Sequence, residues 1–186
     1  MWVLSSVGCG GGAATAGPAT PGAKLDATAA RFSAQGLSVA RPDGWQLAAA
    51  DKSVGKDVVV VLIGPTVDQR LAATVEIARR PLSAMDKRRP PAELVGMVTQ
   101  EAIQTFEGSD AVAAPAEAMV AGLKGVVVQV KYDEPLADGT EVPRVAKIYA
   151  VVAGDNLWMV RCVLPSGGAF ESDLNSILAS IAFEST

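Results

Sequence analysis

The side chains that most often carry catalysis are scarce in this chain of 186 residues, which contains no histidine. Without imidazole the chain lacks the usual general base, the partner that activates a serine or cysteine nucleophile, and the commonest transition-metal ligand. Neither Ser166-Gly167-Gly168 nor Glu107-Gly108-Ser109 matches the Gly-x-Ser-x-Gly turn that exposes a nucleophile between a strand and a helix. We interpret both segments as turns or helix ends, and we expect no catalytic residue.

Motifs for phosphate, dinucleotide or metal binding are incomplete as well. Gly55-Lys56 lacks the upstream glycine of a P-loop and the serine or threonine that follows it, and the glycines of 8–12 precede no βαβ unit. Four acidic residues cluster in one predicted loop: Asp133, Glu134, Asp138 and Glu141. Their oxygens could hold a hard cation, but the spacing is not that of an EF-hand. We interpret them as a solvated turn and expect neither a cofactor nor a metal site.

The two cysteines have different surroundings. Strand alternation places Cys162 on the same face as Trp158, Val160 and Leu164, which predicts a buried core thiol rather than a nucleophile. Trp45 and Trp158 are interpreted as core anchors on the same grounds. Cys9 instead lies in Ser6-Val7-Gly8-Cys9, directly before a run of glycines.

This tetrapeptide resembles the end of a bacterial lipoprotein signal, in which a small residue precedes a cysteine whose thiol receives a diacylglyceryl group. Only eight residues precede Cys9 and none is Lys or Arg, whereas a secretory signal has a basic region and about 7–15 apolar residues. We therefore expect residues 1–8 to be a truncated or atypical signal, and one account is that the native start lies upstream of Met1. The alternative is a flexible cytosolic N-terminus in which Cys9 has no role.

The amino-acid composition differs between an N-terminal segment and the rest of the chain. Residues 9–31 are mostly Gly, Ala, Pro and Thr and should form a flexible linker, because they cannot bury enough apolar surface to offset ordering entropy. Residues 32–186 are long enough for one domain with one core. The 16 basic and 20 acidic side chains give a net charge of −4, so we expect no binding to nucleic acid.

Hydrophobic periodicity predicts both kinds of secondary structure. Apolar alternation or β-branched runs predict seven strands, over 37–40, 45–48, 57–63, 73–79, 123–132, 144–152 and 157–164. Helical spacing predicts one helix over 90–108 and a second over 170–181. Gly154-Asp155 and Asp138-Gly139 predict hairpins, and Pro42-Asp43-Gly44 predicts a similar reversal. We therefore expect an α+β domain with an antiparallel sheet of about six to seven strands and two helices.

The order of these elements resembles the PsbP-like fold superfamily. The resemblance rests on the order and spacing of the elements, including the turn Arg41-Pro42-Asp43-Gly44-Trp45 and a closing helix that ends Ser180-Ile181-Ala182-Phe183, and it covers about residues 32–184. The superfamily includes PsbP, Mog-type Ran-binding proteins, DcrB-type and LpqN-type lipoproteins, and effector chaperones of type VI secretion. The resemblance implies a non-enzymatic role in binding or assembly, and it carries no binding residue over to this chain.

Two functions follow as expectations. The first is an accessory protein of the bacterial cell envelope, anchored by a lipid on Cys9, that binds a protein partner or a small apolar ligand through the sheet or through a groove between sheet and helix. The second is a cytoplasmic chaperone that shelters a hydrophobic client helix. Arg79-Arg80 and Lys87-Arg88-Arg89 could face anionic headgroups or an acidic partner, or they could form a solvated loop.

The first expectation makes Cys9→Ser informative in the full-length precursor. We expect this variant to lose membrane association in the native host, because the serine hydroxyl cannot receive the thioether-linked lipid. Fractionation of membranes from soluble protein measures the effect. Pelleting of the variant at the same level as the parent would rule out a lipid anchor.

Overall fold

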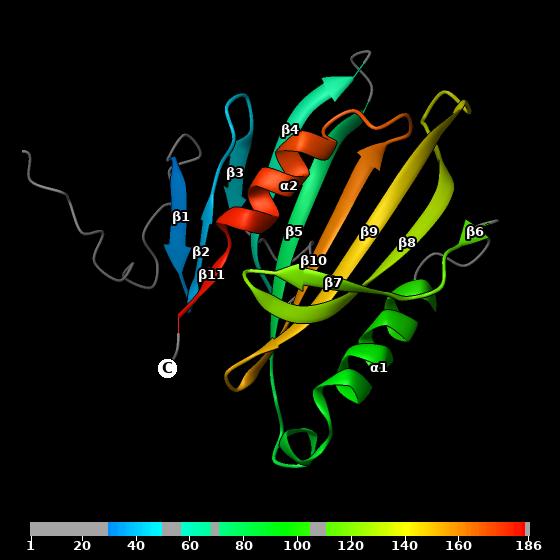
Figure 1. Ribbon diagram of the computed structural model, residues 1–186. Coiled ribbons are helices and arrows are strands. Elements are labelled where there is room, and N and C mark those ends of the chain that lie inside the picture. Colours follow the sequence, from blue (N-terminus) through cyan, green and yellow to red (C-terminus); the bar gives the residue numbers. More distant parts are fainter. Residues whose placement is uncertain (1–29, 50–56, 68–70, 105–110, 185–186) are drawn as a thin grey trace, which may run out of the picture.

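The computed structural model describes residues 30–49, 57–67, 71–104 and 111–184, which form two antiparallel sheets and two α-helices (Figure 1). The smaller sheet has the order β1-β2-β11, and the larger has the order β3-β4-β5-β10-β9-β8-β6, with β7 also paired to β8. The small-sheet strands are β1 (Arg31–Ala34), β2 (Leu37–Ala40) and β11 (Ala182–Phe183). The large-sheet strands are β3 (Gln46–Ala49), β4 (Val58–Val67), β5 (Leu71–Pro81), β6 (Ala111–Val112), β7 (Ala116–Val120), β8 (Leu123–Pro135), β9 (Glu141–Ala153) and β10 (Asn156–Pro165).

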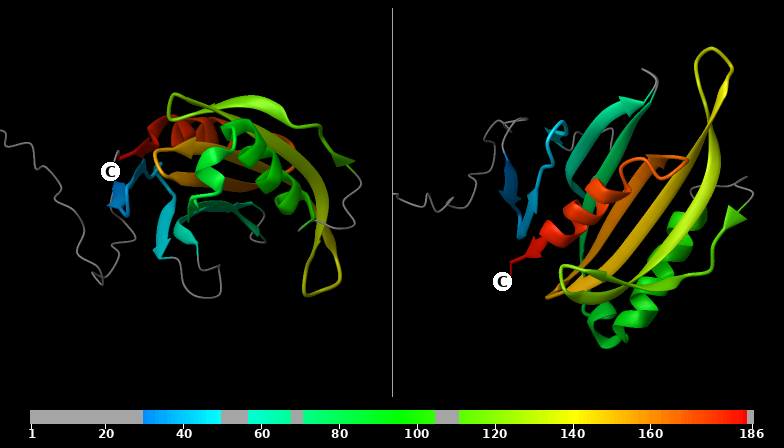
Figure 2. Two further views of the ribbon diagram at one scale, coloured as in Figure 1. Left: turned by 90° about the horizontal axis from the view of Figure 1, so that it is seen from below. Right: turned by 45° about the horizontal axis from the view of Figure 1, so that its top comes forward.

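These elements confirm the predicted α+β class with an antiparallel sheet. Each of the seven predicted strands has a counterpart, and the two predicted helices are α1 (Pro91–Gln104) and α2 (Glu171–Ser180). Strands β8 and β9 are longer than predicted, and Figure 2 shows their hairpin projecting beyond the neighbouring strands. Strands β1, β6, β7 and β11 were not predicted: β6 and β11 have only two residues each, and β1 and β7 contain few β-branched residues to mark them as strands.

The predicted turns form, but one of them has a different role. Gly154-Asp155 joins β9 to β10, and the Asp138 carboxylate accepts hydrogen bonds from the backbone N–H and the hydroxyl of Thr140 in the β8–β9 turn. At Pro42-Asp43-Gly44 the Trp45 N–H donates to the Pro42 carbonyl over 3.2 Å, yet β2 and β3 do not pair. Strand β2 already pairs with β1 on one edge and with β11 on the other, so the turn carries the chain from one sheet to the other.

Helix α2 packs on one face of the large sheet, over the main apolar core. Its Leu174 and Ile177 are fully buried, and removing each from water contributes about 1.5–3 kcal/mol. The Trp45 indole N–H donates to the Asp173 carboxylate over 2.9 Å, which ties the start of α2 to the turn before β3. Cys162 lies in the same core with no exposed surface, and burial raises the pKa of its thiol well above the ordinary value. The prediction of a core thiol is therefore confirmed.

Helix α1 packs on the opposite face of the sheet. Its Val95 contacts Ala150 and Leu157, whereas Trp158, the next residue along β10, belongs to the core under α2. Adjacent residues of a strand point to opposite faces, so the two helices lie on either side of the sheet. Pro91 occupies the first helical position of α1, as the sequence predicts. No helix in the described part of the chain is long and apolar enough to span a membrane.

Candidate functional site

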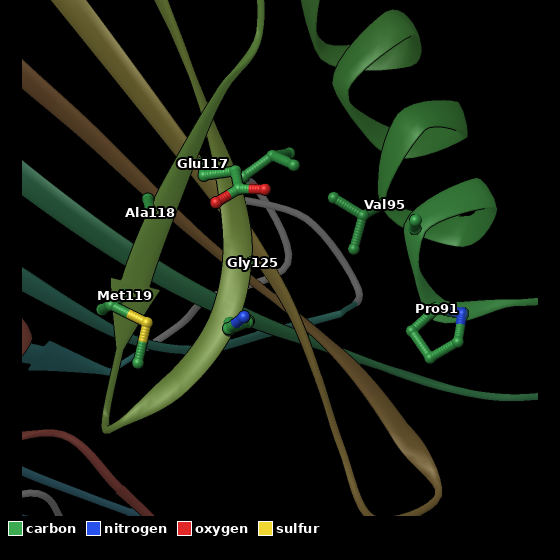
Figure 3. A pocket seen from close by; sticks show the side chains of 9 residues that line it. Pro91, Val95, Glu117, Ala118, Met119 and Gly125 are labelled. Atoms are coloured by element: carbon green, nitrogen blue, oxygen red, sulfur yellow. The ribbon is translucent and has the colours of Figure 1, made fainter.

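An open groove lies between the first turns of α1 and the β7–β8 hairpin. Its volume is about 570 Å³, and it faces solvent on one side. Helix α1 contributes Pro91, Ala92 and Val95, β7 contributes Glu117, Ala118 and Met119, and β8 contributes Lys124, Gly125 and Val126. Figure 3 shows Val95 pointing from the helix toward the two strands. The groove therefore lies between sheet and helix, where the sequence analysis expected binding.

The β7–β8 hairpin forms the strand wall of this groove. Its two-residue turn, Ala121-Gly122, has positive φ angles of 52° and 75°, as a type I′ turn requires. Strand β8 pairs on both edges here, because Gly125 lies opposite Ala118 of β7 and opposite Val151 of β9. A Cβ atom at position 125 would collide with the carbonyl oxygen of Ala150. Glycine at this position therefore permits the close approach of β8 to β9 at the base of the groove.

The groove offers apolar contact with little polar chemistry. Met119 is apolar, yet the residue is 58% exposed. Methionine is flexible and polarisable, so it can pack against apolar surfaces of varied shape. Glu117 and Lys124 are the charged members of the lining. Among the described residues no three His, Cys, Asp or Glu side chains come together as a metal site would require. The arrangement is suited to binding apolar groups, with one charge of each sign to orient them.

Comparison with solved structures relates the architecture to other proteins. LpqN of Mycobacterium tuberculosis, described as involved in cell envelope biogenesis, matches with a TM-score of 0.56 and 11% identity over 80% of this chain and 83% of its own. CyanoP, the PsbP protein of Synechocystis, matches with a TM-score of 0.51 and 15% identity over 89% and 98%. The chain has the PsbP-like fold.

A protein of Bacteroides thetaiotaomicron also shares this fold, with a TM-score of 0.51 and 11% identity over 80% of this chain. The match covers 45% of that protein, so this chain spans less than half of its length. No protein-family model and no curated protein matches the sequence. The PsbP-like fold is thus confirmed from architecture, at identities that show the fold alone.

Three of the basic residues singled out in the sequence have partners within the fold. Arg79 donates to the Gln35 carbonyl over 2.6 Å, and its guanidinium lies 6.0 Å from the centre of the Trp158 ring. Lys87 pairs with Asp155 at 2.6 Å, and Arg89 pairs with Glu93 at 2.7 Å. These charges stabilise local structure, each with a different neighbour.

The four acidic residues singled out in the sequence lie in the β8–β9 hairpin, and two of them have partners of different kinds. Glu134 lies beside Arg144, whereas Asp138 closes the β8–β9 turn through Thr140. Trp45 and Trp158 are buried, as predicted, and Ser166-Gly167-Gly168 forms the turn before α2. Cys9, Gly55-Lys56 and Glu107-Gly108-Ser109 lie outside the described residues. The strand wall of the groove was not predicted, because β7 was not predicted. The Ala121-Gly122 sequence was the available signal for the β7–β8 turn.

Gly125→Ala tests whether the close approach of β8 to β9 maintains the groove. We expect a loss of about 1–3 kcal/mol in the free energy of unfolding, because the added methyl group displaces the Ala150 carbonyl. Urea denaturation measures the change. Gly96→Ala is the matched control: position 96 lies on α1 with no atom near its Cβ site, so it should gain about 0.5–1 kcal/mol. Equal effects of the two substitutions would contradict this account of the hairpin.

Proposed function

We propose that the protein is a non-enzymatic accessory protein of the bacterial cell envelope that binds an apolar segment of a partner protein in the groove between α1 and the β7–β8 hairpin. The observation that carries the proposal is the groove itself, which is open to solvent and lined mainly by apolar side chains from three elements. Support for the envelope comes from the lipoprotein-like Gly8-Cys9 junction and from the shared fold of LpqN.

A partner segment fits the shape and the edges of the groove. Within the described part of the chain, β7 pairs only with β8, so its other edge offers backbone groups to an extended segment. The exposed Met119 beside this edge can pack against the apolar side chains of such a segment. Glu117 and Lys124 would set its direction through charge. The volume also lies within the range of about 300–1,000 Å³ that small ligands occupy, so a small apolar ligand is the competing occupant.

Attachment through Cys9 completes the proposal. A lipid on Cys9, followed by the linker predicted before β1, would hold the domain at the membrane while leaving the groove accessible. One acyl chain gives only marginal membrane binding, whereas two chains anchor stably, and a diacylglyceryl group has two. If the parent protein and the Cys9→Ser variant were equally soluble, with neither associated with membranes, the cytoplasmic chaperone would be favoured instead.

Photo-cross-linking from the groove tests the binding proposal in the native host. A photoreactive residue at Met119 should yield one dominant protein adduct, whereas the same residue at Met85 should not. Met85 is 69% exposed and does not line the groove, so it controls for exposed methionine.

Purified partner then allows affinity to be measured by calorimetry. We expect Met119→Glu to weaken binding about tenfold, equivalent to about 1.4 kcal/mol, through loss of apolar contact, and Met85→Glu to leave the affinity unchanged. Adducts that are equal from both positions would contradict a partner in this groove. An adduct that adds only the mass of a small molecule would replace the partner segment with a small apolar ligand.

A further inference from the structure

A second hollow lies on the face of the sheet that α1 covers in part. It is located over the first half of β9, near Arg144. Its volume is about 310 Å³, and strands β5, β8, β9 and β10 all contribute to its walls. Arg144 and Arg161 supply the positive charges of this lining, and Glu134 supplies the negative charge. The groove at α1 has a different lining, so this hollow is a separate feature.

Arg144 is the unusual residue in this hollow, because its side chain is only 3% exposed. Its Nη2 atom donates to the Ala72 carbonyl over 2.8 Å, and its Nε atom lies 3.3 Å from a Glu134 carboxylate oxygen. Nε and Nη1 nevertheless make no hydrogen bond to any described residue. A residue that lines the hollow thus has two buried guanidinium nitrogen atoms without a hydrogen bond to the described residues, one of them within ion-pair distance of Glu134.

Arg161 repeats this arrangement on the neighbouring strand. Its Nη2 atom pairs with the Glu76 carboxylate at 2.7 Å across the β5–β10 pairing, whereas its buried Nε atom has no hydrogen-bond partner among the described residues. The Glu76 carboxylate therefore already pairs with Nη2 of Arg161. Three buried donor atoms thus belong to two arginine residues that line one small space.

Hydrogen-bond donors without partners determine which chemical class of ligand the hollow can bind. Leaving a buried donor without a partner costs about 1–3 kcal/mol, and more when the group is charged. A guanidinium has donors only, so the missing partner must supply acceptor oxygens. A carboxylate matches the planar fork of a guanidinium with two parallel hydrogen bonds. The apolar neighbours Val163 and Ala72 favour a ligand with an apolar body.

We infer that this hollow binds the carboxylate of a small organic acid, with Arg144 as the principal donor and Arg161 as the second. The volume of about 310 Å³ limits the ligand to a small molecule. Tyr132 also lines the hollow and interacts with Arg144, and burial raises the pKa of its phenol. Glu134, on the more exposed rim, competes with the ligand for Arg144. The inference is independent of a partner in the α1 groove.

Sodium benzoate is the probe, titrated into the ¹⁵N-labelled protein at constant ionic strength with sodium chloride as the balancing salt. We expect saturable shifts of the amide resonances of Thr74, Tyr132 and Val163, which line the hollow. Arg144→Lys keeps the positive charge but cannot form two parallel hydrogen bonds to a carboxylate. It should weaken benzoate binding about tenfold, equivalent to about 1.4 kcal/mol. Arg88→Lys is the matched control, since Arg88 is exposed and lies in the short helix Asp86–Arg88, outside the lining.

A second variant keeps the test decisive if Arg144→Lys fails to fold. Glu134→Gln removes the competing carboxylate from the rim and should bind benzoate about tenfold more tightly than the parent. No saturable shift in either the parent or Glu134→Gln up to about 50 mM benzoate would overturn the inference. Sulfate binding as tight as benzoate binding would overturn the assignment to a carboxylate.

Discussion

The pairing of β5 with β10 is the interaction on which the rest of the structure depends. It joins the N-terminal strands β3, β4 and β5 to the later strands β8, β9 and β10, and it brings Val75 opposite Cys162 across a long stretch of sequence. The pair Glu76–Arg161, at 2.7 Å, lies across the same two strands. A slip of one residue would exchange every side chain between the two faces of the sheet. The register therefore fixes both the core under α2 and the face under α1.

The two faces that this register creates are covered to different degrees. Helix α2 buries its face with Leu174, Ile177 and Leu178, and both tryptophans of the domain belong to that core. Helix α1 covers only part of the opposite face, chiefly where Val95 meets Ala150 and Leu157. Both proposed binding sites, the groove beside α1 and the hollow at Arg144, therefore lie on the face that α1 leaves partly uncovered.

Sequence patterns predicted most of the fold because the long strands are rich in β-branched residues and the helices have a clear apolar stripe. Alternation alone placed Cys162 in the core. The candidate sites depend instead on contacts between distant segments. Gly125 matters because the Ala150 carbonyl lies against it, and Arg144 is buried by neighbours from three other strands. The reversal at Pro42-Asp43-Gly44 forms as predicted, but the sequence pattern could not show that it leads to a different sheet, because one partner of β2 is β11, at the far end of the chain.

Native-state hydrogen exchange tests the central role of the β5–β10 pairing most directly. The account predicts that the amides of β5 and β10 exchange only through global unfolding, with opening free energies that equal the global value from urea denaturation within about 0.5 kcal/mol. Amides of β5 and β10 that open at a much lower free energy, while β8 and β9 stay protected, would contradict it. The large sheet would then be two separable halves, and the register between them could not determine both faces.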